Sequence, residues 1–257
     1  QPDSKDEIAY LGKHINRMLD EISKASQQRE ADLKANQIME IQLLQQQINP
    51  HLLYNTLDSL LWYLQQNQND QAIALTSSMS EFFKISLSKG SDFVTLGREL
   101  QLIQHYLEIQ HVARYQDIHL ICDVSEDLYD YPVIKLLLQP IVENAIIHGF
   151  AGYRDDGTIC IETLKTAGLL EIAVTDNGIG ILPEEIEEIQ QILRQNIKEK
   201  QGRCFGLYNI NRRIVQTYGA NYGLSIESEI SEYTTVRIRI PYSEDQEAQD
   251  HERYDYR

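Results

Sequence analysis

The first part of the chain carries hydrophobic residues at alternating spacings of three and four. These positions are Ile8, Leu11, Ile15, Met18, Ile22 and Ala25. The spacing is typical of a coiled-coil seam, because every member lies on the face that a partner helix covers. The seam breaks at the polar stretch SQQREADLKANQ and resumes at Ile41, Leu44 and Ile48. The break predicts a register shift between two helical units, which would form a joint able to pass a signal.

Three more helices are predicted before residue 115. Apolar positions at helical spacing continue to a polar turn, QQNQND, and resume after it; they are Leu53, Leu57, Leu60, Leu61 and Leu64, then Ala72, Leu75, Met79, Phe82 and Phe83. The two amphipathic segments predict a helical hairpin. A third helix is expected at about residues 98–114, after the loop SKGSD.

The second half of the chain alternates short β-type runs with helical segments. The runs are IHLICDV, TICIETL, LLEIAVTD, YGLSIES and TTVRIRIP, and the helical segments cover residues 133–148, 183–197 and 207–218. This alternation predicts a layered domain with helices packed on a sheet. The polar end, SEDQEAQDHERYDYR, is expected to be disordered.

Composition and charge narrow the class of protein. The chain has 257 residues, of which 42% are hydrophobic and 24% charged, as in an ordinary globular protein of one or two domains. Its formal net charge of -16 argues against direct binding to nucleic acid, since neutralising phosphates needs clustered Lys and Arg. The cysteines, Cys122, Cys160 and Cys204, show no C-x-x-C spacing, which favours a reducing compartment over disulfides or a zinc site. The chain contains no run of 18 apolar residues, so the sequence predicts no membrane span. Because the chain begins at Gln1, we expect it to be a piece of a larger protein.

Polar residues interrupt an apolar helical segment at LLLQPIVENAIIHG. Asn144 and His148 are four residues apart and share a helix face, with Glu143 beside them. Amide and carboxylate oxygens are ligands that Mg²⁺ accepts while it keeps waters and borrows phosphate oxygens from a nucleotide. Alone, the pattern is equally typical of a solvated helix end.

A second motif, DNGIGI, follows the predicted strand EIAVT. Gly178 and Gly180 would let the backbone approach a flat ligand, and the Asp176 carboxylate would accept a hydrogen bond from an exocyclic amine such as that of adenine. A turn after a strand uses the same residues, so this motif alone is weak.

A third motif, GRCFGLYNINRRI, places Gly202 and Gly206 ahead of a helix that is expected to start near Leu207. A glycine-rich entry into a helix offers backbone amides and the positive end of the dipole to phosphate. Ordinary helix capping would look the same, and it is the order of the three motifs that points to a nucleotide site.

In this order, ENAIIHG, DNGIG and GRCFGLYNI resemble the N, G1 and G2 boxes of the GHKL ATPase superfamily, and QQINPHLLYNTLDSL resembles the phosphoacceptor segment of LytS/YesM-type sensor histidine kinases. DEIAYLGKHINRMLDEI is similar to the second half of a HAMP linker. The resemblance covers nearly the whole chain. It implies an α+β protein in which a coiled-coil and helical-hairpin dimerisation region precedes a GHKL, or Bergerat-type, α/β sandwich.

The resemblance also implies an activity and its site. His51 would be phosphorylated by ATP, with Asn144 as the Mg²⁺ ligand and with nucleotide contacts from His148, Asp176, Gly178, Gly180, Gly202, Gly206 and Leu207. The partners it implies are a second copy of the chain and a response regulator, a transcription factor, that receives the phosphoryl group on an Asp. The chain would be the cytoplasmic portion of a bacterial plasma-membrane receptor.

Pro50 gives a physical reason for the position of His51. A proline inside a helix removes a backbone hydrogen bond and clashes with the carbonyl four residues earlier, here that of Gln46, at a cost of about 3 kcal/mol. We hypothesise that the resulting kink presents the His51 imidazole to the γ-phosphate. Asn55, one turn later, would orient the ring by a hydrogen bond. Glu143 would act either as a base or as a group that contacts the metal ligand and not the metal itself, and the sequence does not choose between these roles.

Two departures from the family pattern leave alternatives open. A Gly-x-Gly-Thr turn is usual near the end of the domain, whereas this chain has Ser231, Glu232, Tyr233 and Thr234. The segment between Ile181 and Gly202, which would cover ATP, is rich in acids. The alternatives are an ATPase that forms no phosphohistidine and a signalling scaffold that has lost catalysis. We expect four segments: 1–28 (second half of a HAMP linker), 29–115 (dimerisation and phosphotransfer helices), 116–242 (ATP-binding domain) and 243–257 (tail).

Overall fold

The computed structural model describes residues 50–87, 92–114, 118–150, 157–166, 168–195 and 205–243. The predicted coiled coil, the HAMP-like segment and nearly all of the tail lie outside these residues. The chain divides into two compact units between Tyr54 and Asn55, so the hairpin and the α/β domain from Asn55 onward belong to one unit. The four predicted segments remain predictions.

Three helices form the hairpin region, as the apolar spacing predicts. They are α2 (Pro50–Gln65), α3 (Asn69–Ser86) and α4 (Leu96–Arg114). The hydroxyl of Tyr63 in α2 donates a hydrogen bond to the carbonyl of Val112 in α4 at 2.9 Å. The rings of Phe82 in α3 and Tyr106 in α4 pack with their centroids 6.0 Å apart. α4 starts two residues earlier than expected because Thr95 caps it, its Oγ1 accepting from the amide of Arg98 at 3.3 Å.

A five-stranded mixed sheet forms the base of the α/β domain. In spatial order its strands are β2 (Ile118–Asp123), β4 (Gly157–Thr166), β5 (Leu169–Asp176), β7 (Tyr233–Pro241) and β6 (Gly223–Glu229). β2 pairs with β4 in parallel, and the other neighbours are antiparallel. Alternate residues of the central strands, such as Ile159, Ile172 and Ile238, are fully buried, so one face of the sheet carries the core.

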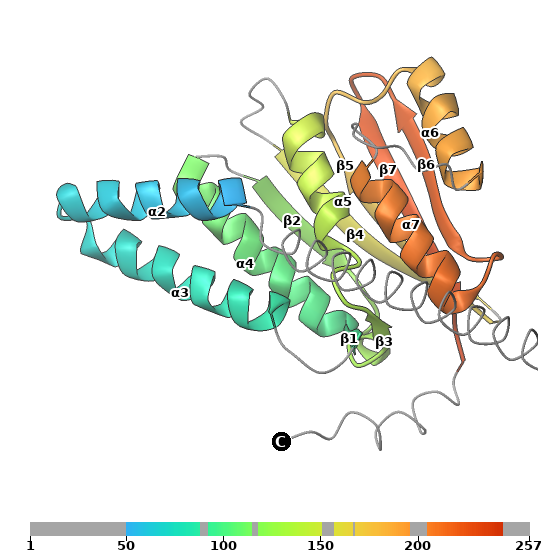
Figure 1. Ribbon diagram of the computed structural model, residues 1–257, viewed down its shortest axis with the longest axis horizontal. Coiled ribbons are helices and arrows are strands. Elements are labelled where there is room, and N and C mark those ends of the chain that lie inside the picture. Colours follow the sequence, from blue (N-terminus) through green and yellow to red (C-terminus); the bar gives the residue numbers. More distant parts are fainter. Residues whose placement is uncertain are drawn as a thin grey trace, which may run out of the picture. The chain divides into compact units, whose positions relative to one another are not determined.

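Helices cover that face of the sheet. They are α5 (Gln139–Asn144), which continues as a π-helical turn (Ala145–Gly149), α6 (Pro183–Gln195) and α7 (Phe205–Tyr218). Figure 1 shows α5 and α7 in front of the strands and α6 next to β6. A 3-10 turn (Glu126–Leu128) follows β2. None of the helices in the described ranges is long and apolar enough to cross a membrane.

One predicted helix is shorter than expected. The prediction of a helix from residue 133 is wrong, because β3 (Pro132–Ile134) forms there and pairs antiparallel with β1 (Phe93–Thr95). A turn follows in which Leu136 has a positive φ of 57°. α5 begins only at Gln139, next to Pro140, whose fixed φ suits the first turn of a helix.

Candidate functional site

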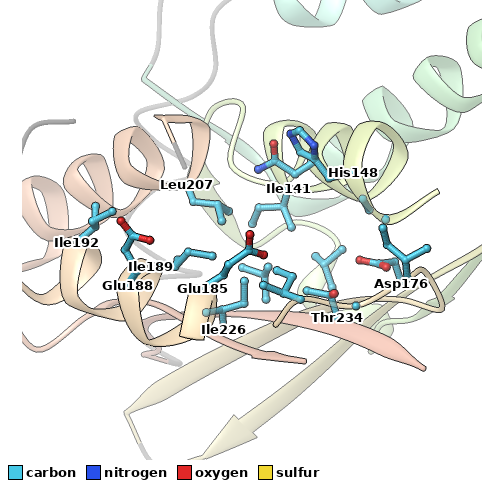
Figure 2. Close-up of a pocket in the computed structure, with 18 residues that line it drawn as sticks. Ile141, His148, Asp176, Glu185, Glu188, Ile189, Ile192, Leu207, Ile226 and Thr234 are labelled. Carbon is cyan, nitrogen blue, oxygen red and sulfur yellow. The ribbon is translucent and has the colours of Figure 1, made fainter. Parts of the chain in front are cut away.

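A cavity of about 360 Å³ lies between the sheet and the three helices, and it brings the predicted motifs together. Ligand sites are usually at least this large and mainly apolar, with a few polar groups. The lining includes Asn144, His148, Asp176, Gly180 and Leu207. Figure 2 shows Asp176 at one end of the cavity and Glu188 with Ile192 at the other.

Asn144 and His148 both line the cavity, as their spacing predicts, although the helix widens into a π turn between them. Among the described residues, the Asn144 Nδ2 atom is buried and has no hydrogen-bond partner. A buried polar atom without a partner costs about 1–3 kcal/mol, which a ligand in the cavity would recover. Asn144 is therefore the side chain of this helix most clearly poised to bind.

Glu143 is on the same helix as Asn144 but is not among the residues that line the cavity. Its Oε1 atom accepts a hydrogen bond from Nε2 of Gln139 at 2.9 Å, one turn earlier on α5. Burial raises the pKa of Glu143, and the hydrogen bond from Gln139 acts in the opposite direction. A carboxylate with a raised pKa is a stronger base, so both roles considered for Glu143 stay open.

Asp176 is the last residue of β5 and is only 6% exposed. Burial raises its pKa from the ordinary value of 3.8 to about 6, although the amide of Gly178 donates to Oδ1 at 2.9 Å and lowers it. Oδ2 is left to accept from a ligand at the end of the cavity. At neutral pH the group is mostly ionised and acts only as an acceptor, which fits an exocyclic amine.

The glycines after Asp176 are needed for close backbone contacts. A Cβ at Gly178 would lie 2.4 Å from the carbonyl oxygen of Gly149, and a Cβ at Gly180 would lie 2.2 Å from that of Glu229. Gly180 also has a φ of 71°, which side chains other than glycine rarely adopt. The sequence analysis expected these glycines to let the backbone approach a flat ligand; the close neighbours in the structure are protein backbone, and contact with a ligand stays a prediction.

The turn between β6 and β7 packs against the DNGIG loop. The amide of Ser231 donates to the carbonyl of Ile179 at 2.8 Å, and the amide of Ile179 donates to the carbonyl of Gly149 at 2.9 Å. Ser231 has a positive φ of 64°, the conformation that a glycine would favour, whereas Tyr233 lies in the extended strand β7. Only one of the two replaced glycines therefore stands where a glycine would relieve strain.

The third motif meets the first at the start of α7. Gly206 lies beside Asn144, since a Cβ built on Gly206 would be 3.6 Å from Nδ2 of Asn144. Leu207 lines the cavity. Gly202 lies outside the described residues, and its predicted role in binding phosphate remains a prediction.

Several residues that line the cavity were not predicted from the sequence. Gly149 is part of ENAIIHG, and Thr234 lies in the altered turn, but neither stood out as a site residue. Glu185 and Glu188 of α6 reach the cavity although they belong to a run of acids that looks like a solvated helix face. The four-residue spacing of Glu185, Ile189 and Leu193 is the signal that could have indicated which face of α6 turns inward.

His51 and Asn55 both lie in α2, four residues apart along one helix face. The carbonyl of Asn55 accepts a hydrogen bond from Ser59 at 2.8 Å. Gln46, whose carbonyl Pro50 would displace, lies outside the described residues. The kink and the orienting role of Asn55 therefore stay predictions.

The residues present fit a nucleotide with Mg²⁺. The cavity has an acceptor for an amine at Asp176 and an unpaired amide nitrogen at Asn144, which can donate to a phosphate oxygen, beside the amino end of α7. The described residues contain no group of three or more His, Cys, Asp or Glu side chains able to hold a metal. A single amide oxygen is consistent with Mg²⁺, which commonly takes few protein ligands and completes its shell with water and phosphate.

Comparison with protein families gives two matches in the order of the motifs. The family model described as "Histidine kinase" matches residues 39–118. The model described as "Histidine kinase-, DNA gyrase B-, and HSP90-like ATPase" matches residues 129–244, which contain the whole cavity. Together the two matches cover most of the chain.

Known sensor histidine kinases are similar to this chain over most of its length. Sensor histidine kinase YesM of Bacillus subtilis is 32% identical over 238 residues, which are 93% of this chain and 39% of YesM. Sensor protein LytS of Streptococcus mutans is 33% identical over 217 residues, 81% of this chain and 35% of LytS. The chain thus spans less than half the length of these relatives. Among solved structures, the histidine kinase domain of Erythrobacter litoralis EL346 aligns with 75% of this chain and 95% of that domain, at 20% identity and a TM-score of 0.42.

Proposed function

Since the chain belongs to the histidine kinase family and is related to the LytS and YesM sensor kinases, we propose that it phosphorylates its own His51 from ATP. The phosphoryl group then passes to an Asp of a response regulator. The observation that carries the proposal is the cavity in which Asn144, Asp176 and Leu207 converge from three separate motifs. We further propose that this piece is the cytoplasmic portion of a membrane receptor.

The proposed reaction is a phosphoryl transfer. An imidazole nitrogen of His51 bonds to the γ-phosphorus while the bond from that phosphorus to the β–γ bridging oxygen breaks, and ADP leaves. The imidazole proton passes to a base, for which Glu143 is the candidate because burial raises its pKa. Such transfers depend mainly on positioning and on neutralising charge.

The chain's own residues divide the positioning between the base and the phosphates of the nucleotide. The Asp176 carboxylate accepts a hydrogen bond from the exocyclic amine of adenine, and the apolar walls of the cavity exclude water from the adenine ring. Asn144 and the amino end of α7 hold the phosphate end. Bound Mg²⁺ would neutralise phosphate charge there, with Asn144 as its protein ligand.

A homodimer fits an exposed apolar stripe on α2. Leu57, Leu61 and Leu64 are between 42% and 56% exposed and are spaced four and three residues apart, as in a helix–helix seam. We propose that this stripe packs against a second copy of the chain.

Incubation of the purified protein with γ-labelled ATP and Mg²⁺ tests the function. Acid-labile label on the parent, absent from the His51→Gln and Asn144→Ala variants, is the expected result. Label that persists in His51→Gln would refute the assignment of the phosphorylated residue. ATP hydrolysis without covalent label would favour the ATPase alternative, and absence of nucleotide binding in a dimeric protein would favour the scaffold.

A further inference from the structure

A buried carboxylate outside the cavity holds the turn that leads into α5. Glu99, in the first turn of α4, is 1% exposed. Its two oxygens accept the backbone amides of three consecutive residues, Leu136 at 2.7 Å, Leu137 at 2.8 Å and Leu138 at 3.0 Å. Successive amides that converge in this way form an anion-binding nest, and the positive φ of Leu136 helps to make it. The nest is filled by a side chain that comes from another element.

The chemistry of these contacts matches an ionised carboxylate. All three partners are donors, and an ionised carboxylate is only an acceptor. Burial raises the pKa of Glu99, while the three amides and the charge of Arg213 act to lower it. A buried charge is costly unless it is fully paired, so this carboxylate would be replaced by an apolar side chain if α4 needed only packing at this position.

The same turn is also bound by a side chain of α7. Nη2 of Arg213 donates to the carbonyl of Lys135 at 2.6 Å. The turn at residues 135–138 therefore has hydrogen bonds to α4 through Glu99 and to α7 through Arg213. α5 carries Asn144 and α7 carries Gly206, which lie next to each other in the site.

α4 is also the helix that the α/β domain shares with the hairpin. Its amino end is fixed to the domain by the amides of Leu96 and Gly97, which donate to the carbonyls of Tyr131 at 2.9 Å and Tyr129 at 2.8 Å. Further along, Tyr106 packs on α3 and Val112 accepts the hydrogen bond from α2. A displacement of the hairpin therefore reaches the domain through α4, and Glu99 is the buried charged residue of α4 that contacts the domain.

We propose that Glu99 is a positioning residue that couples α4 to the phosphate end of the nucleotide site. It holds the turn at residues 135–138 so that Asn144 on α5 and Gly206 on α7 keep the geometry needed for phosphoryl transfer. The effect on catalysis rests on the proposed kinase function, whereas the coupling of α4 to α5 does not. Asp176 ends β5 and its Oδ1 accepts from the amide of Gly178, so the adenine end is held chiefly by contacts other than those of Glu99.

Hydrogen exchange of the protein without nucleotide tests the coupling first. Glu99→Gln places an NH₂ group where one acceptor oxygen was, so at least one amide of the nest loses its partner. We expect exchange to rise at least tenfold in residues 135–149 and to stay at the parent's level in β4 and β5. The control Glu108→Gln changes an exposed Glu of the same helix whose Oε2 accepts from Ser78 of α3; Gln keeps an acceptor oxygen there, so exchange in residues 135–149 should match the parent. Unchanged exchange in residues 135–149 would overturn the proposal, as would an equal rise across the whole sheet.

Autophosphorylation kinetics separate positioning from a purely structural role. Partial unfolding lowers the amount of protein that becomes labelled, but it leaves the rate constant of the folded molecules unchanged. At saturating ATP we expect Glu99→Gln to lower the first-order rate constant at least tenfold, while the dissociation constant of Mg²⁺-free ADP stays within threefold of the parent's. A parent-like rate constant would overturn the catalytic part of the proposal.

Arg213→Gln provides a second variant that loosens the same turn from the α7 side. It should raise exchange in residues 135–149, and its effect combined with Glu99→Gln should be less than the product of the single effects, because both act through one turn. Independent, multiplicative effects would contradict a shared turn. If the parent forms no phosphohistidine, the proposed function fails, and the exchange measurements still decide whether Glu99 couples α4 to α5.

Discussion

Replacing Asp176 by Asn should stabilise the protein at neutral pH while it weakens nucleotide binding. The carboxylate is 6% exposed, and burial raises its pKa from 3.8 to about 6. A raised pKa means that the folded state holds the proton more tightly than the unfolded state. The protonated form is thus the stable one, and stability is lost as pH rises through the folded-state pKa.

The size of the effect follows from the two pKa values. A shift of roughly two units corresponds to about 3 kcal/mol, since one unit is worth about 1.4 kcal/mol. This penalty is absent below pH 3.8 and complete above pH 6. Between about pH 4.5 and 7.5 the ionisation of Asp176 should lower the parent's free energy of unfolding by about 2 kcal/mol. The Asp176→Asn variant should not show this loss.

Urea denaturation of parent and variant across this pH range measures the difference directly. Effects of the other titrating groups cancel in the difference, and Asp123→Asn at an exposed position controls for the change in net charge. The advantage of Asp176→Asn should grow with pH. A difference that is constant from pH 4.5 to 7.5 would refute the burial argument.

The affinity for nucleotide should change in the opposite direction to the folding stability, both on replacing Asp176 by Asn and on raising the pH of the parent. Asp176→Asn turns a donor toward the exocyclic amine, and losing a hydrogen bond to a charged group while leaving a donor unpaired should weaken binding by roughly a hundredfold. In the parent, affinity should fall as pH drops below about 6, because protonation removes the acceptor. Calorimetric titration with ADP checks both expectations, and parent-like binding by the variant would exclude Asp176 as the adenine acceptor.

Three further predictions concern the turns and the dimer. Ser231→Gly should raise the free energy of unfolding in urea by up to about 1 kcal/mol, since the φ of 64° is strained for serine, and a loss of stability would contradict this reasoning. Gly180→Ala should destabilise the protein far more than Gly168→Ala and should abolish ADP binding. Both glycines have a positive φ, but only at Gly180 would the new Cβ meet a backbone oxygen, at 2.2 Å. Equal losses of stability in thermal unfolding would show that the clash is unimportant. Leu61→Glu should convert the proposed dimer to a monomer in light scattering, whereas Leu164→Glu, a similarly exposed position on β4, should not. A dimeric Leu61→Glu protein would exclude the α2 stripe as the interface.

Local patterns in the sequence predicted much of the fold and part of the site. The run LLEIAVTD predicted β5 with its bounds, and the spacing of Asn144 and His148 predicted that both face the same cavity. These predictions succeed because the period of a strand or helix, and the residue that ends it, are set by neighbours in sequence. The order of three motifs then indicated that separate segments serve one site.

Tertiary contacts decided the features that the sequence left open or misplaced. Val133 and Ile134 suited a helix by spacing, but pairing with β1 makes them a strand. Leu136 has no residue signature for a positive φ, and its conformation depends on a carboxylate 37 residues earlier in the chain. The inward face of α6 and the burial of Glu99 likewise depend on what packs against them. The sequence by itself determined the family, the motifs and most elements, because these follow from local chemistry; which groups are buried together was decided only when distant segments met.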